Sequence, residues 1–245
     1  MQKIFVKTKQ IHNNQVSIIG EDIKHIVNVL HMQIDEKIQI CNMENSENYI
    51  AKIKKIQKEE IIAEITEKLN ISTESNVKID LYQGLPKADK MELIIQKTTE
   101  LGISRIIPTE LSRCIVKLEE KNSEKKIERW QKIAEAAAKQ SKRDRIPKIE
   151  NITEIKNIEL QNYDLFLVAY EEETEQTLKQ ELKKLPKQTE YEIGILIGPE
   201  GGIEFQEIET LKENGAKIVT LGKRILRTET APIAMVSNII YELEN

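Results

Sequence analysis

The sequence predicts an α/β protein in two parts: a strand-rich first third and a C-terminal part in which strands alternate with helices. The first 70 residues consist of short segments in which apolar and polar side chains alternate, the period of a half-buried strand. From residue 77 onward, apolar runs such as DLFLVAY (164–170) are separated by segments of helical periodicity. Such apolar runs are typical of parallel strands covered on both faces. We therefore expect a small β-barrel followed by an α/β domain.

The first part is expected to hold five strands and one helix. The strands are expected at 3–7, 15–19, 37–41, 48–57 and 59–69. The helix, 21–31, is predicted from an apolar stripe formed by Ile23, Ile26, Val27 and Leu30. The polar segment NISTESN (70–76) is typical of a linker, which places the two domains at 1–70 and 77–245.

The second part begins with a strand at 77–84 and a helix at 87–102 that ends at Gly102. A helix at about 121–140 carries Trp130 on its apolar stripe, so we expect this ring in the core. The remaining expected elements are strands at 164–170, 191–198 and 217–222, helices at 175–186 and 203–215, and a final helix after Thr230. Thr228 or Thr230 is expected to cap that last helix, and Pro232 suits its first turn.

Composition excludes several classes of protein. No apolar run approaches the roughly 20 residues of a membrane helix. The N-terminus also lacks the apolar stretch of a signal peptide. Two cysteines, Cys41 and Cys114, are too few for a disulfide framework or a zinc site, so we expect idle thiols in a reducing cytoplasm and no metal. The formal charge of −4 argues against indiscriminate nucleic-acid binding.

The charge distribution is nevertheless uneven. All seven arginines lie from Arg105 onward. The run KQSKRDRIPKI (139–149) holds five basic residues against one acidic residue, a local charge of +4. Such a run indicates either a solvated face or a contact with RNA phosphates.

Glycine is concentrated near the C-terminus. Five of the nine glycines are Gly194, Gly198, Gly201, Gly202 and Gly222. The run ILIGPEGG (195–202) leads from a strand end into a helix start, where ligands bind in open α/β sheets. It matches neither a P-loop nor a dinucleotide fingerprint, and Glu200 would repel a phosphate unless it turned away. The run therefore suits a ligand held by backbone hydrogen bonds and shape, or else a tight turn without any ligand.

A second loop of this kind, LGKRILRTETAP (221–232), also follows a strand and precedes a helix. Its two arginines, Arg224 and Arg227, suit contacts with phosphates or bases. Together with a third strand end, VAYEE (168–172), these loops predict a pocket at one edge of the sheet.

Four ordered motifs carry a family resemblance over nearly the whole chain: GLPKADKMELIIQKTTELG (84–102), RWQKIAEAAAKQSKR (129–143), LIGPEGG (196–202) and LGKRILRTETA (221–231). With them the sequence resembles the bacterial 16S rRNA uridine N3-methyltransferases (ribosomal RNA small subunit methyltransferase E) of the SPOUT superfamily. The resemblance implies an N-terminal PUA-like RNA-binding barrel and a C-terminal SPOUT domain with a deep trefoil knot. It further implies a homodimer with the final helix near the interface. One departure is His31, which follows Val29-Leu30 where the family usually has Arg.

The resemblance also implies the cofactor, S-adenosylmethionine (SAM), and the substrate, uridine 1498 of 16S rRNA in the small ribosomal subunit. The implied cofactor-binding residues are Ala169, Leu196, Gly198, Pro199, Glu200, Gly202, Leu221, Gly222, Ile225, Leu226, Arg227, Thr230 and Ala231. The expected RNA-binding residues are Arg113, Lys139, Lys142, Arg143, Arg145 and Arg224.

Uridine N3 carries a proton that must leave before or during methyl transfer. The site is therefore expected to offer a base or a cation that stabilises negative charge on the uracil. Arg227 is the candidate cation, and Glu229 and Glu171 are the candidate bases. Two alternatives remain open: a SPOUT methyltransferase with another RNA target, and a non-catalytic RNA-binding assembly factor.

Overall fold

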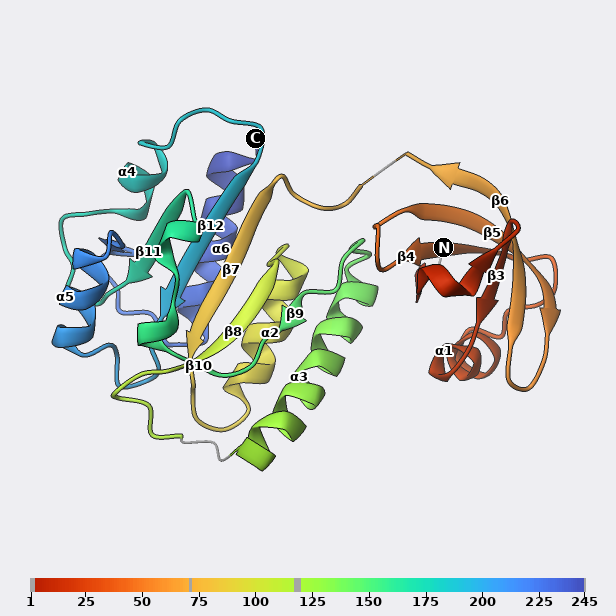
Figure 1. Cartoon of the computed structure of the whole chain (residues 1–245), viewed down its shortest axis with the longest axis horizontal. Helices are drawn as coiled ribbons and strands as arrows, with labels where there is room; N and C mark the ends of the chain where they lie inside the picture. Colours follow the sequence, from red (N-terminus) through yellow and green to blue (C-terminus); the bar gives the residue numbers. More distant parts are fainter. Residues whose placement is uncertain (1–2, 71, 117–119, 245) are drawn as a thin grey trace. The chain divides into compact units, whose positions relative to one another are not determined.

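The computed structural model describes residues 3–70, 72–116 and 120–244 (Figure 1). The chain forms two compact units. The first unit reaches to Glu74 and also includes Lys139–Arg145. The second unit comprises Ser75–Ala138 and the chain from Ile146 onward. Residue 71 of the expected linker lies outside the described residues.

A curved six-stranded sheet dominates the first unit (Figure 1). Its strands are β1 (Lys3–Val6), β2 (Ile11–His12), β3 (Gln15–Ile18), β4 (Lys37–Asn42), β5 (Asn48–Ile56) and β6 (Ile61–Leu69), hydrogen-bonded in the order β1-β4-β5-β6-β3-β2. The pair β1–β4 is parallel and the others are antiparallel. Alternate side chains such as Ile38 and Ile40 are fully buried in one core. The five strands predicted from the period of two are thus confirmed.

The predicted helix at 21–31 is present in a shorter form. It begins as α1 (Glu21–Lys24) and continues as a π-helical turn over His25–Val29. Ile23 and Ile26 of the predicted stripe are buried against the sheet. His31 follows in the left-handed region, with φ of 53°, and so ends the helical segment.

A buried ionic cluster attaches residues 139–145 to the first unit. Lys3 Nζ lies 2.5 Å from Asp144 Oδ1, and both side chains are at most 2% exposed. The Asp144 carboxylate also accepts hydrogen bonds from Asn48 Nδ2 at 2.6 Å and from the Thr73 backbone N–H at 2.6 Å. Although burial alone would raise the pKa of Asp144, these hydrogen bonds lower it below its usual range. A buried charge is tolerated only when it is compensated in this way.

Both cysteine thiols are free and buried. Burial raises the pKa of Cys41 to about 12, and burial also raises the pKa of Cys114. Because the thiolate is the reactive form, we expect a thiol reagent at pH 8 to label neither residue in the native protein and both in denaturant. The pKa of the Cys41 thiol is about 9 in the unfolded chain and about 12 in the folded protein. Its contribution to stability is therefore complete below pH 9 and is lost as the pH rises toward 12. Rapid labelling of the native protein would contradict the burial of the thiols.

A parallel sheet forms the centre of the second unit. Its strands are β7 (Val77–Gly84), β8 (Arg105–Glu110), β9 (Lys148–Ile149), β10 (Thr153–Glu154), β11 (Leu165–Ala169), β12 (Tyr191–Ile197) and β13 (Lys217–Val219). They run in the order β10-β8-β7-β12-β11-β13, and β9 also pairs with β8. Every pair is parallel. In the central strands consecutive residues, which point to opposite faces, are buried: Leu81 and Tyr82 in β7, and Ile195 and Leu196 in β12. The predicted doubly covered sheet is therefore confirmed.

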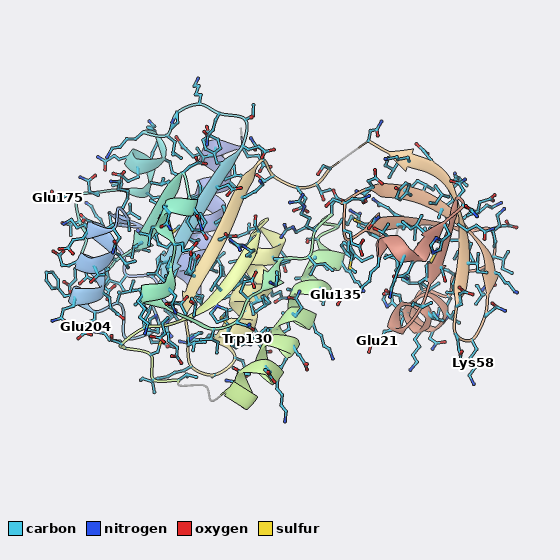
Figure 2. The ribbon with its side chains drawn as sticks, viewed as in Figure 1. Glu21, Lys58, Trp130, Glu135, Glu175 and Glu204 are labelled. Carbon is cyan, nitrogen blue, oxygen red and sulfur yellow. The ribbon has the colours of Figure 1, made fainter. Side chains whose placement is uncertain are left out.

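The helices of this unit are α2 (Lys90–Glu100), α3 (Glu120–Gln140), α4 (Leu178–Leu182), α5 (Phe205–Glu213) and α6 (Thr230–Leu243). Figure 1 shows α6 beside α2, and α6 also packs against β7. Gly102 follows α2 with φ of 101°, as expected of a glycine at a helix end. Trp130, labelled on α3 in Figure 2, is 5% exposed and belongs to the core, as predicted. None of the described helices is both long and apolar enough to span a membrane.

Two predictions for helix ends are wrong. The helix predicted at 175–186 is only α4, because Glu173 accepts hydrogen bonds from the backbone of the next turn and Thr177 becomes the N-cap. The N-cap of α6 is Glu229, without any side-chain capping bond, in place of Thr228 or Thr230. The Thr228 hydroxyl has a different partner, the Gly198 carbonyl.

Candidate functional site

A cavity of about 640 Å³ lies in the second unit where β11, β12 and β13 end. Because these neighbouring strands are parallel, the loops that follow them emerge at the same edge of the sheet. The three loops begin at Tyr170, Gly198 and Thr220. The structure thus brings together the three segments that the sequence analysis selected.

Most of the predicted cofactor-binding residues line this cavity. They are Ala169, Gly198, Pro199, Glu200, Gly202, Leu221, Gly222, Ile225, Leu226, Arg227 and Ala231. Leu196 does not line it, because its side chain is fully buried within β12. Thr230 does not line it either and is exposed at the first position of α6.

Glycine is required at two positions of the loop after β12. Gly202 has φ of 73°, and a Cβ atom there would overlap the carboxylate of Glu171. A Cβ atom on Gly198 would lie 2.9 Å from Ile203 Cγ1 and against the backbone of Gly202. At Gly198 the loop therefore folds back on itself so closely that a side chain is excluded, and at Gly202 the positive φ favours glycine.

The negative charge of Glu200 is compensated by its neighbours. It accepts a hydrogen bond from the Lys87 backbone N–H at 3.1 Å, and Lys90 Nζ lies 2.8 Å away. Partial burial would raise the pKa of Glu200, but the bonds from Lys90 and the backbone lower it. The hydrogen bond to Glu200 in turn raises the pKa of Lys90.

Lys90 lines the cavity and was missed as a site residue, although it stands in the motif GLPKADK (84–90). The motif marked the helix start but did not indicate which basic side chain would reach the loops. Other lining residues that sequence reasoning missed are Glu173, Thr174, Thr177, Ile197, Thr220, Lys223 and Thr228.

The three candidate catalytic side chains lie in or beside the cavity. Arg227 is exposed and lines it, as does Glu171. Glu229 is adjacent in the chain, and its side chain is 17% exposed. Its buried Oε2 has no hydrogen-bond partner among the described residues, while Lys90 Nζ stands 3.4 Å away as an ion-pair partner.

The predicted RNA-binding residues divide between the two units. In the second unit, Arg113 is exposed and donates to the Gly201 carbonyl at 3.1 Å, and Arg224 is exposed at the cavity. In the first unit, Lys142 and Arg145 are exposed.

Lys139 and Arg143 are engaged in ion pairs within the first unit. Lys139 pairs with Asp22 at 3.0 Å. The Arg143 side chain is 6% exposed and pairs with Glu74 at 2.5 Å. Arg143 therefore serves an internal ion pair, in contrast to the surface contact expected from the basic run.

A second cavity, of about 690 Å³, lies between α5 and residues 155–166. None of the predicted site residues lines it. Within the described part of the chain, no three His, Cys, Asp or Glu side chains gather as a metal site would require.

Comparison with known proteins decides the family. Residues 73–240 match the profile of an RNA methyltransferase domain, and residues 18–66 match that of an RNA methyltransferase PUA domain. Ribosomal RNA small subunit methyltransferase E from Bacillus subtilis (strain 168) is 38% identical over 100% of this chain and 98% of its own length. The chain belongs to the ribosomal RNA small subunit methyltransferase E family. The resemblance seen in the four motifs is thereby confirmed.

Solved structures agree with membership of the methyltransferase E family. The crystal structure of a protein named only as hypothetical is 37% identical, with a TM-score of 0.89 and 99% of both chains covered. The methyltransferase E from Neisseria gonorrhoeae, solved bound to S-adenosyl methionine, is 28% identical over 99% of this chain and 98% of its own, with a TM-score of 0.83. The N-terminal unit is accordingly PUA-like, and the C-terminal unit is the RNA methyltransferase domain.

Proposed function

We propose that this chain binds SAM in the cavity at the ends of β11, β12 and β13 and methylates N3 of uridine 1498 in 16S rRNA of the small ribosomal subunit. The observation that carries the proposal is that loops from three strand ends, selected from sequence alone, line one cavity. A cavity of about 640 Å³ lies within the range that encloses small-molecule ligands. The SAM-bound structure of the Neisseria gonorrhoeae relative supports the choice of ligand.

The residues of the cavity fit an organic ligand with little phosphate charge. At Gly198 the loop has no space for a side chain, so its backbone groups can approach the ligand closely. Leu221, Ile225 and Leu226 supply apolar surface, and Ile225 is 83% exposed until a ligand covers it. When bound, SAM supplies an electrophilic methyl group on a sulfonium.

The chain's own contribution is to position the acceptor nitrogen and to manage its proton. Arg227, exposed at the cavity, is proposed to stabilise the negative charge that develops on the uracil. Glu229 and Glu171 are the proposed acceptors of the N3 proton. Of the two carboxylates, that of Glu229 is held in a more fixed position, because it is largely buried beside Lys90.

RNA contacts are proposed on both units. Arg224 lines the methyltransferase cavity, and Arg113 is hydrogen-bonded to Gly201 of the loop after β12, so both suit phosphate contacts on this unit. On the PUA-like unit, Lys142 and Arg145 are the exposed members of the basic run. Lys139 is a further candidate if RNA phosphate replaces Asp22 as its partner.

Three family properties belong to the same proposal: a trefoil knot in the C-terminal domain, a homodimer through α6, and action in the cytoplasm, where small subunits assemble. The hydrogen bond from Thr228 to the Gly198 carbonyl holds the segment before α6 at the end of β12. Tyr241 on α6 is 75% exposed and supplies apolar surface for a second copy. Analytical ultracentrifugation showing only monomer at micromolar concentration would contradict the dimer.

The function is tested in two steps with the full chain. Calorimetric titration with SAM should give saturable heat, and SAM should raise the midpoint of thermal unfolding. The absence of both effects would favour the non-catalytic RNA-binding factor.

Reverse transcription of 16S rRNA then identifies the target. N3 methylation blocks Watson–Crick pairing, so the stop at uridine 1498 should be present in the wild type, disappear in a deletion strain and return on complementation. A stop that persists in the deletion strain would exclude this uridine and favour another RNA target.

A further inference from the structure

A buried chain of hydrogen bonds joins three segments that are distant in sequence. Gln83 is the penultimate residue of β7, Thr228 precedes α6, and Gly198 follows β12. Gln83 Nε2 donates to Thr228 Oγ1 at 3.1 Å, and Thr228 Oγ1 donates to the Gly198 carbonyl at 2.7 Å. Gln83 is fully buried, and Thr228 is 6% exposed.

The direction of this chain is fixed by the chemistry of its members. A hydroxyl has one proton, and that of Thr228 is used toward the Gly198 carbonyl. The same oxygen must therefore accept from the amide nitrogen of Gln83. The second hydrogen of that nitrogen goes to the Gly84 carbonyl at 3.0 Å, so Gln83 is held at both donors.

The last link orients the peptide bond between Gly198 and Pro199. Proline has no backbone N–H, so the Gly198 carbonyl is the only polar group by which hydrogen bonds can fix this peptide. Gly198, Pro199 and Thr228 all line the cavity, whereas Gln83 lies behind it. A rotation of this peptide would shift the start of the loop that contains Gly202.

Gln83 is not arranged for stability alone. Its Oε1 atom is buried and has no hydrogen-bond partner among the described residues. An unpaired buried acceptor destabilises a fold, so an apolar side chain of equal length would serve a purely structural role as well or better. The retained amide points to a requirement for its donors.

We propose that Gln83 is a positioning residue for the cofactor cavity, which acts through Thr228 to fix the carbonyl of Gly198 and hence the loop after β12. The inference rests on the proposed binding of SAM. Although no residue of β7 lines the cavity, Gln83 of this strand would then contribute to the affinity for the cofactor.

The test compares affinity with stability in the full chain. Gln83→Met removes the donors and the unpaired acceptor together. We expect SAM to bind about tenfold more weakly, while the midpoint of thermal unfolding stays within about 3 °C of the wild type. Thr228→Val should weaken SAM similarly, and Thr228→Ser, which keeps the hydroxyl, should restore most of the affinity. The double variant should be little weaker than either single variant, because both interrupt one chain.

Thr98→Val is the matched control. The Thr98 hydroxyl is also fully buried and donates to a backbone carbonyl, that of Ile94, at 2.7 Å, but it lies within α2 and does not line the cavity. Its loss should lower the unfolding midpoint and leave SAM affinity unchanged. If the wild type binds SAM and the Gln83→Met and Thr228→Val variants bind it equally well, the positioning role is overturned. If the wild type itself shows no binding, the proposed function fails, and the inference fails with it.

Discussion

Replacing Gly202 by valine is expected to abolish SAM binding, with an affinity at least about 100-fold below that of the wild type. The residue has φ of 73°, where a β-branched side chain is strongly disfavoured. Its Cβ atom would also overlap the Glu171 carboxylate, which lines the same cavity. The loop must therefore move, or the Glu171 carboxylate must leave its position beside the loop. Calorimetric titration of the variant with SAM measures the loss.

Gly102→Val is the matched control for backbone strain. Gly102 has φ of 101° and nothing within 4 Å of an added Cβ atom, and it does not line the cavity. We expect this variant to unfold at a lower temperature than the wild type and to bind SAM normally. If Gly202→Val bound SAM with wild-type affinity, the cofactor would have to lie elsewhere.

Replacing Asp144 by leucine is expected to destabilise the first unit by about 3–5 kcal/mol, because the ammonium group of Lys3 would remain buried without its countercharge. Hydrogen–deuterium exchange of β4 and β5 measures this effect locally, since a protein of two units need not unfold in one transition. In the variant, exchange in β4 and β5 should be faster than in the wild type, whereas exchange in β7 and β12 should be little changed.

The pair Lys3 and Asp144 also allows a double-mutant test. Lys3→Met combined with Asp144→Leu should recover much of the lost stability, because replacing both members of a buried ion pair by apolar side chains is often neutral. Asp35→Asn breaks the exposed pair with Lys52 and should leave exchange unchanged. An Asp144→Leu variant with wild-type exchange would show that the cluster adds nothing to the stability of the first unit.

Periodicity predicted most of the fold because the main strands are buried on one or both faces. The strand β8 was missed: its sequence, RIIPTE, is short and contains Pro108, which is normally excluded from strand interiors. The π-helical turn at His25–Val29 also leaves little trace in a sequence, because an amphipathic stripe does not distinguish it from an α-helix.

The site was predicted in its backbone and less well in its side chains. The loops of the site could be predicted from the glycines at the strand ends, because only glycine fits where the backbone closely approaches other atoms. Lys90, and the link from Thr228 to Gly198, depend on which distant segment each side chain meets, and local patterns carry no such information. For the same reason the basic run did not show that Arg143 would be buried against Glu74.

The contact between Lys3 and Asp144 joins the two ends of a long stretch of nascent chain. A ribosome that has just completed β6 must still add about 75 residues before the carboxylate exists, which takes about 4–15 s at about 5–20 residues per second. During that interval the first unit lacks the group that neutralises its buried ammonium. The PUA-like unit therefore reaches its final packing only after residues 139–145 of the chain have been synthesised.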